Sequence, residues 1–296
     1  MHVLNPKFAM YSTPKAGQEN QDTAFFDDVA RSFGVLDGMG GHEQGEVASS
    51  LARDAAIPVL GEPSTSTVDA LAKIMTALQA GNSSVCDYNW PIGSHGTNNK
   101  KSGTTALLGQ FVTRDKNYID LCLGWAGDCR GYLFRRGKLE HLTIDDTISA
   151  YCGGSKAKDA YKQKMQNQVT CSNWTSSDID EQIKYFYNRH RILTYLGEAS
   201  KKTLDGWKHH PEVELEFVNG DPRVCCSVEP GDMLLFCSDG ISDNLVDADI
   251  AKLLSSGDVE YAAQNLLRLG KQIASQPLEV NPRAKDDDMT ALVIKV

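Results

Sequence analysis

Three aspartates stand where apolar segments of the sequence begin or end. Asp37 follows SFGVL, Asp239 follows MLLFCS, and Asp287 lies just before the segment MTALVIKV. Because strand ends from distant parts of a chain can meet at one rim of a core, we expect these carboxylates to converge there. Oxygen ligands of this kind suit hard divalent cations such as Mg²⁺ and Mn²⁺. Two such ions about 3.5–4 Å apart can activate a water for attack on a phosphoryl group.

A glycine follows two of these acids, in Asp37-Gly38 and Asp239-Gly240. A single Asp-Gly pair is most often an ordinary turn. The repeated order of strand, Asp and Gly, together with NQD at 20–22 and DDDMT at 286–290, favours a metal site over two unrelated turns. Without a side chain, Gly38 can bring its carbonyl oxygen close enough to serve as a further ligand.

Periodicity and turn residues predict the elements that would position these acids. We expect short strands and two hairpins in the ranges 31–38, 231–240, 288–296, 104–127 and 130–143. Arg136 and Gly137 should form the turn of the second hairpin. Helical spacing of apolar residues predicts helices over 45–60, 67–85, 179–197, 247–256 and 258–275. Since hairpins outnumber strand–helix alternations, the sheets should be largely antiparallel, with helices on their outer faces.

The composition is that of an ordinary globular chain of 296 residues, with a formal net charge of −9. This acidic balance argues against a nucleic-acid partner, which would require a basic surface. The N-terminal segment lacks the apolar core of a signal peptide, and no segment approaches the ~18–20 apolar residues of a membrane span. The eight cysteines include no C-x-x-C pair, which indicates buried thiols in a reducing compartment. We therefore expect a cytoplasmic protein with no membrane partner.

Eight short motifs, spread over nearly the whole chain, carry a resemblance to a known family. In this order the sequence resembles the metal-dependent serine/threonine protein phosphatases, the protein phosphatase 2C family, and its DGMGGH form is closer to the bacterial-type branch. Any one motif is weak, whereas eight in register are specific. The motifs are ENQD (19–22), VLDGMGGH (35–42), SGTTA (102–106), AGDCRGYL (126–133), LTIDD (142–146), LTYLG (193–197), LLFCSDGISDNL (234–245) and DDMTALVI (287–294).

The resemblance implies an α+β fold, a four-layer αββα sandwich of two mainly antiparallel β-sheets flanked by helices. A single catalytic domain would span residues 1–296, with a flap insertion at about 147–192, where the sequence is polar and weakly periodic. The implied activity is hydrolysis of phosphoserine and phosphothreonine in a phosphorylated protein substrate. A water or hydroxide activated at a binuclear Mn²⁺ or Mg²⁺ centre, with a third ion in many members, would attack the phosphate. We expect the chain to act as a monomer.

The resemblance also implies a role for each acid at the strand ends. Asp37 corresponds to the carboxylate that bridges the two metals, and Gly38 contributes its carbonyl oxygen to one of them. Asp239 and Asp287 correspond to the acids that hold the other metal.

Two further acids complete this implied ligand set. Asp22 corresponds to an early acid that acts mainly through metal-bound water, and Asp128 corresponds to a weaker ligand of a third metal. In the C-terminal triplet, Asp287 takes the ligand position and Asp288 takes the position of an Asn in the family pattern. Asp286 is expected to be solvated.

The sequence departs from the family pattern at three places. Gly17 stands where many members carry an Arg that binds the substrate phosphate, and the nearby Lys15 is a candidate substitute or an ordinary loop lysine. Met39 stands where animal members carry a His used as a general acid. His42 is a candidate for that catalytic role, although bracing of the glycine loop is favoured for it. Asp146 replaces the His of an LTxDH motif at the entry to the insertion.

Two other functions stay open at this point. The chain could be a pseudophosphatase, an adaptor that keeps the fold without turnover, or a phosphoesterase that acts on small phosphate esters. The retained acids argue against a pseudophosphatase. The insertion would decide between protein substrates and small phosphate esters.

Overall fold

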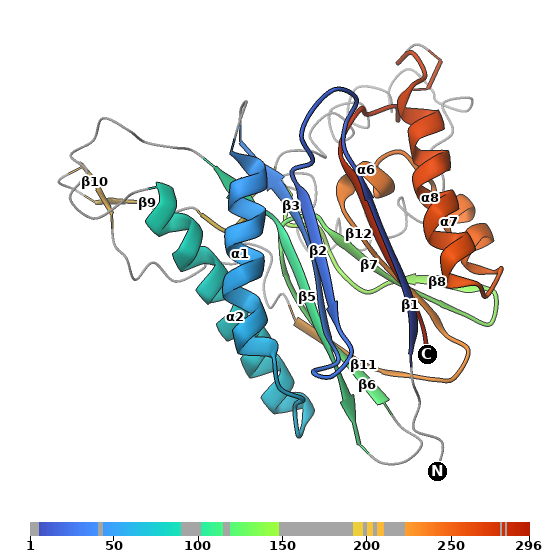
Figure 1. Cartoon of the computed structure of the whole chain (residues 1–296), viewed down its shortest axis with the longest axis horizontal. Coiled ribbons are helices and arrows are strands. Elements are labelled where there is room, and N and C mark those ends of the chain that lie inside the picture. Colours follow the sequence, from blue (N-terminus) through green and yellow to red (C-terminus); the bar gives the residue numbers. More distant parts are fainter. Residues whose placement is uncertain are drawn as a thin grey trace, which may run out of the picture.

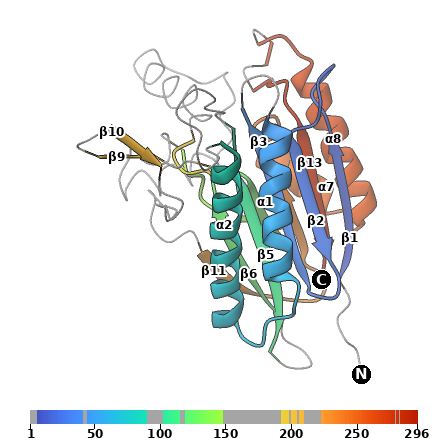
Figure 2. The ribbon, with the colours of Figure 1, turned by 60° about the vertical axis from the view of Figure 1, so that its left-hand side comes forward.

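The computed structural model describes residues 6–40, 44–89, 102–114, 119–147, 192–197, 200–203, 206–209, 223–278, 280–281 and 283–296. Within these ranges, two β-sheets pack face to face and helices cover the outer face of each, as Figure 1 shows. Figure 2, turned to bring the α1 and α2 side forward, shows these helices lying over one sheet. The expected αββα sandwich is therefore confirmed.

The first sheet has six strands, and every pairing in it is antiparallel. Helices α1 (Gly45–Leu60) and α2 (Thr67–Asn89) cover its outer face. The strand order is β11 (Arg223–Val228), β6 (Ile119–Ala126), β5 (Ala106–Thr113), β3 (Ser32–Met39) and β2 (Asp22–Asp27), with the short β4 (Gly103–Thr104) paired to the end of β3.

The second sheet has five strands, again with antiparallel pairings. Helices α6 (Asp239–Ser242), α7 (Asp247–Leu254) and α8 (Val259–Ala274) pack on its outer face. The strand order is β1 (Lys7–Thr13), β13 (Met289–Lys295), β12 (Met233–Cys237), β7 (Arg130–Arg135) and β8 (Lys138–His141). A separate pair, β9 (Ser200–Thr203) and β10 (Gly206–His209), forms a two-stranded sheet.

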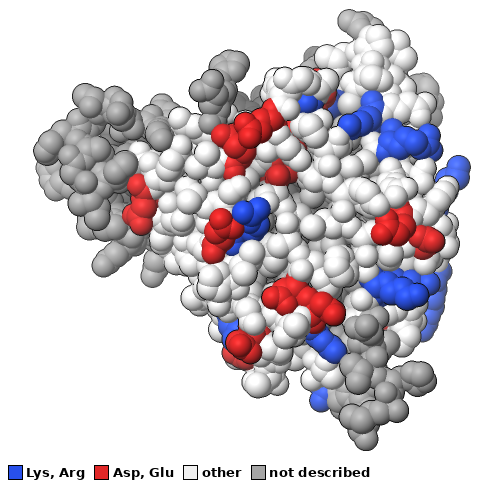
Figure 3. All heavy atoms as spheres, viewed as in Figure 1, with Lys and Arg blue, Asp and Glu red and all other residues white. Residues whose placement is uncertain are grey.

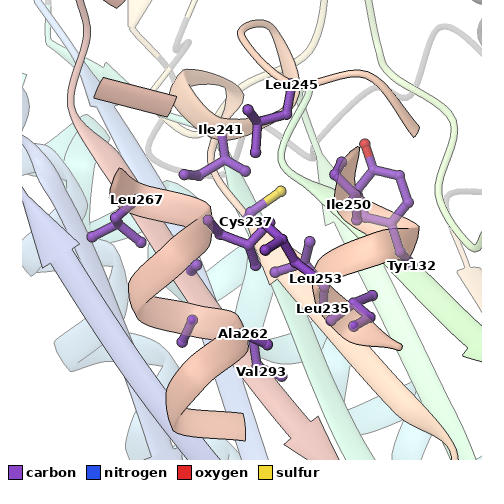
Figure 4. Close-up of a cluster of buried hydrophobic side chains, with 14 of the residues drawn as sticks. Tyr132, Leu235, Cys237, Ile241, Leu245, Ile250, Leu253, Ala262, Leu267 and Val293 are labelled. Atoms are coloured by element: carbon purple, nitrogen blue, oxygen red, sulfur yellow. The ribbon is translucent and has the colours of Figure 1, made fainter. Parts of the chain in front are cut away.

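Three hydrophobic clusters fill the spaces between the four layers. The cluster between the sheets includes Phe33 of β3 and Phe236 of β12, whose ring centroids lie 4.3 Å apart. Figure 4 shows the cluster under α6, α7 and α8, where Leu235 and Val293 of the sheet meet Leu253. Burial of this much apolar surface is the main force that holds the layers together.

Most of the expected elements are confirmed. Helix α1 has the predicted bounds, and α8 begins after Asp258, whose carboxylate accepts the Tyr261 N–H at 2.9 Å as an N-cap. The second hairpin turns at Arg136 and Gly137, whose φ angles of 50° and 81° are both left-handed. This is the conformation that a tight two-residue turn between β7 and β8 requires.

Two expectations need correction. The helix expected over 179–197 is wrong for its described end, because Thr147 pairs with Ile192 and Thr104 pairs with Leu196 as β-bridges. The remainder of that helix, and the interior of the insertion, lie outside the described residues. Strands β1, β2 and β11 were not predicted. In β1 only Ala9 is buried, so its sequence carries no alternation of apolar and polar residues.

The surface fits the acidic composition. On the face drawn in Figure 3, the described Lys and Arg side chains lie in small groups interspersed with Asp and Glu. Among the residues that the structure describes, no helix has the length and apolar character needed to cross a membrane.

Candidate active site

Two of the predicted acids face each other on neighbouring strands. In the antiparallel pairing of β2 with β3, Asp22 lies opposite Asp37. The backbone of Asp37 is held by the next strand segment, since its carbonyl oxygen accepts the Thr104 hydroxyl and the Thr105 N–H, both at 2.9 Å. Both carboxylates are therefore delivered by regular β structure rather than by a loop.

Asp239 reaches the same place from the second sheet. It is the first residue of α6, immediately after β12, and lies at the same end of the sandwich as the start of β2 (Figure 1). The intervening Ser238 connects the two sheets, because its hydroxyl donates to Asp22 Oδ2 at 2.6 Å and accepts the Thr290 N–H at 3.0 Å. This hydrogen bond fixes the orientation of the Asp22 carboxylate.

Gly38 is required where β3 meets the start of α1. A Cβ at this position would collide with the backbone carbonyl of Gly45 and would lie 2.6 Å from the carbonyl oxygen of Gln21. The Gly38 N–H also donates to that Gln21 oxygen at 3.1 Å. Glycine therefore lets three backbone segments meet directly beside Asp37.

The acids of the C-terminal triplet have different surroundings. Asp288 is buried and accepts two backbone N–H groups, from Lys15 at 2.6 Å and from Gln21 at 2.7 Å. It therefore braces the connection between β1 and β2. The carboxylate of Asp287 forms an ion pair with Lys285 at 2.9 Å, and Asp286 is exposed.

Lys285 is a residue of the site that sequence reasoning missed. Its ammonium contacts Asp239, lies 2.9 Å from Asp287 Oδ2, and lies 3.3 Å from Asp243 Oδ2. Burial raises the pKa of Asp239, and the positive charge of Lys285 opposes that shift. A single lysine within the acidic run KDDDMT was the available signal, but only the fold shows which acids it contacts.

Asp128 joins the group from the turn between β6 and β7. The preceding Gly127 has a φ of 104°, which this sharp turn requires, and the Asp128 side chain is buried. Burial raises the pKa of Asp128 well above its usual range, and the nearby charge of Asp239 raises it further.

Burial and mutual repulsion perturb the pair on β2 and β3 in the same direction. Burial raises the pKa of Asp22 to about 7, the Ser238 hydroxyl opposes the shift, and the charges of Asp288 and Asp239 add to it. Burial, followed by the charges of Asp22 and Asp239, raises the pKa of Asp37 well above its usual range. Several carboxylates removed from water are costly for the folded state unless a cation compensates their charge.

Comparison with known proteins shows what this chain is similar to. No family model matches the sequence. The chain is 28% identical over 253 residues, which is 84% of its length, to the serine/threonine protein phosphatase PstP of Mycobacterium tuberculosis, and it spans 39% of that relative's length. A crystal structure of Mycobacterium tuberculosis PstP/Ppp has a TM-score of 0.68 and 25% identity, covering 98% of both chains. The chain is therefore similar, in sequence and in fold, to metal-dependent serine/threonine protein phosphatases.

A second similar solved structure contains metal ions. It is the catalytic domain of PstP in complex with two manganese ions, with a TM-score of 0.67 and 26% identity, covering 98% of this chain and 97% of that chain. The resemblance to the protein phosphatase 2C family and its bacterial-type branch, drawn from the eight motifs, is confirmed.

The donor chemistry of this site fits a hard divalent cation. The side chains around the cluster offer carboxylate oxygens, and three of these atoms are buried without a hydrogen-bond partner, namely Oδ1 of Asp22, Asp128 and Asp239. Such atoms are rare in proteins and call for an ion or water. Within the described ranges, no three Asp, Glu, His or Cys side chains are already placed as a complete ligand set. Lys285 instead holds Asp239 and Asp287.

The other predicted site residues have separate outcomes. His42 lies outside the described residues, so its role stays a prediction. Lys15 reaches the rim of the site through its backbone N–H bond to Asp288. Asp146 is buried next to the start of the range expected to be an insertion, and its carbonyl oxygen accepts the Leu193 N–H at 2.7 Å.

A buried ion pair beneath the site was also missed from the sequence. Arg130 of β7 donates to both carboxylate oxygens of Asp145, at 2.9 and 2.7 Å, and both side chains are buried. Asp145 belongs to the LTIDD motif and Arg130 to the AGDCRGYL motif. The pair therefore joins two of the family motifs just below Asp128.

Proposed function

We propose that this chain is a metal-dependent protein serine/threonine phosphatase that hydrolyses phosphoserine and phosphothreonine monoesters in phosphorylated proteins. The observation that carries the proposal is the group of buried carboxylates with raised pKa values and partnerless oxygens at the meeting of the two sheets. Such a group costs the folded state stability, because its carboxylates repel one another away from water. Groups of this kind are typical of functional sites, and cation binding would compensate their charge. The relative named a serine/threonine protein phosphatase supports the same activity.

Each acid would have a distinct part in holding two Mn²⁺ or Mg²⁺ ions. Asp37 would bridge the ions and the Gly38 carbonyl would bind one of them. Asp239 and Asp287 would hold the second. The PstP catalytic domain, whose solved structure contains two manganese ions, supports Mn²⁺ as a cofactor. When bound, such ions supply a Lewis acid for the phosphoryl group and lower the pKa of the attacking water.

Asp22 and Asp128, both buried, would extend this ligand set. Asp22 has one oxygen committed to the Ser238 hydroxyl, which leaves Oδ1 available to a cation or its water shell. Asp128 would be a weaker ligand of a third ion.

The chain's own residues would orient and bind the substrate. The Thr104 hydroxyl and the Thr105 N–H hold the backbone of Asp37, so the bridging carboxylate keeps one position. Asp288 braces the β1–β2 connection that carries Lys15, whose ammonium would act as a point charge for the substrate phosphate. His42 would serve as proton donor or as a brace of the glycine loop.

The proposal treats residues 1–296 as a single catalytic domain. The pairing of Thr147 with Ile192 supports an insertion that leaves and re-enters the domain at neighbouring points. This insertion would contribute to the choice between protein and small-molecule substrates.

The test compares hydrolysis of a phosphothreonine peptide and of an aryl phosphate with Mn²⁺, then with a chelator. We expect turnover of both that the chelator abolishes. Asp239→Asn should abolish turnover, whereas the matched Asp286→Asn, an exposed acid of the same charge, should leave it unchanged. Turnover of the aryl phosphate alone would indicate a small-ester phosphoesterase. Absence of turnover with Mn²⁺ on both substrates would indicate an adaptor and refute the proposal.

A further inference from the structure

The backbone around Lys285 is fixed onto helix α6. The Asn244 side chain accepts the Lys285 N–H at 3.0 Å and donates to the Lys285 carbonyl at 2.9 Å, and it also donates to the Gly240 carbonyl at 2.8 Å. Two residues earlier, Arg283 donates to the Ser242 carbonyl at 2.9 Å. Lys285 is therefore presented to the acids from a rigid support and differs from a loose surface lysine.

The ammonium of Lys285 uses its full bonding capacity on three acids. A lysine ammonium has three N–H donors and no acceptor, and the carboxylates of Asp239, Asp243 and Asp287 surround it. The lysine side chain keeps 21% of its exposure, so it lies at the rim and not in the core. Asp239 begins helix α6 and Asp287 lies just before β13, so the ammonium connects two segments that are distant in the sequence.

A divalent cation held by Asp239 and Asp287 would lie close to the ammonium of Lys285, which contacts Oδ2 of both acids. Oxygen ligands approach Mg²⁺ at about 2.0–2.1 Å, and two positive charges about 4 Å apart repel strongly where water is scarce. Asp239 Oδ1 has no hydrogen-bond partner and could still meet a cation, but the positive charge of the ammonium on Oδ2 would oppose the binding of that cation to the same carboxylate. Asp243, which the proposed ligand set does not use, lies within reach of the displaced ammonium at the edge of the site.

From this geometry we infer that Lys285 is an intramolecular counter-ion that competes with the metal for Asp239 and Asp287. The inference rests on the proposed metal centre and adds a residue to it. Lys285 holds the acids together before the metal arrives, and metal binding weakens its ion pairs with them. The lysine thereby lowers metal affinity at this position, so occupancy follows the free concentration of the divalent cation.

The experiment measures Mn²⁺ binding to the full chain by isothermal titration calorimetry, and free Mn²⁺ by its electron paramagnetic resonance signal. Lys285→Met should bind Mn²⁺ about tenfold or more tightly than the natural chain. Without metal, the same variant should melt several degrees lower, because three acids then lack their partner. Lys295→Met is the matched control, since that ammonium donates to the Gly257 carbonyl away from the acids. Lys285→Gln is measured in parallel, and it replaces Lys285→Met in the comparison if the Met variant does not fold.

The possible results separate the inference from the proposed function. Unchanged or weaker Mn²⁺ binding in both Lys285 variants would overturn the counter-ion role and leave the metal centre intact. Absence of Mn²⁺ binding in every protein, the natural chain included, would overturn the metal centre and the inference with it. If Lys295→Met bound Mn²⁺ as much more tightly as Lys285→Met, the gain would come from the general loss of positive charge, and this result would also overturn the inference.

Discussion

Replacing Asp22 with Asn should stabilise the metal-free chain, and the gain should grow with pH. Burial raises the pKa of Asp22 to about 7 from an ordinary value of 3.8, so the folded state keeps a proton that the unfolded state has lost. The stability that comes from this proton is fully present below pH 3.8 and is lost as the pH rises through about 7. Asparagine carries no charge at any of these pH values and can still accept the Ser238 hydroxyl.

The size of the effect follows from the pKa difference. Three pKa units correspond to about 4 kcal/mol, because each unit is worth about 1.4 kcal/mol. Between pH 5 and pH 7 the folded state loses about two of these units of stabilisation from the Asp22 proton, and above pH 7 almost none of that stabilisation remains. The difference in unfolding free energy between Asp22→Asn and the natural chain should therefore grow by about 3 kcal/mol from pH 5 to pH 8.

The assay is urea unfolding, followed by tryptophan fluorescence, at several pH values with a chelator present. Asp145→Asn provides a matched contrast, because Asp145 is equally buried but paired with Arg130. Removing that partner leaves a buried guanidinium uncompensated and should cost about 3–5 kcal/mol. The reasoning fails if Asp22→Asn is less stable than the natural chain at pH 8, or if the difference between them does not change with pH.

Two further predictions concern packing and oxidation. Gly38→Ala should destabilise the chain by about 1–3 kcal/mol and reduce Mn²⁺ binding, since its Cβ would meet the Gly45 backbone; an unchanged melting temperature would contradict this. Cys122 and Cys225 face each other across β6 and β11 with sulfur atoms 3.2 Å apart. Hydrogen peroxide should therefore oxidise the two thiols to a disulfide, with release of two water molecules. Peptide mass spectrometry should find that disulfide in Cys226→Ser but not in Cys225→Ser, and a pair that stays as free thiols would contradict this.

Much of the fold could be predicted because its elements have local signatures. The helix at 45–60 and the hairpin turn at Arg136 and Gly137 depend on residues near one another in sequence, namely helical spacing and left-handed turn positions. The edge strand β1 could not be predicted, since only Ala9 is buried and its partner β13 lies at the other end of the chain. Its strand character comes from pairing rather than from its own sequence.

The same distinction holds for the site. The sequence alone determined that Asp37 and Asp239 stand at strand ends beside glycines, because apolar runs and Asp-Gly pairs are local patterns. Only the tertiary structure decided that Asp22 lies opposite Asp37, and that Lys285 connects Asp239 to Asp287. Sheet register and ion pairs between distant residues depend on how the layers pack. The charge balance of the cluster is therefore a property of the folded sandwich, and no single motif contains it.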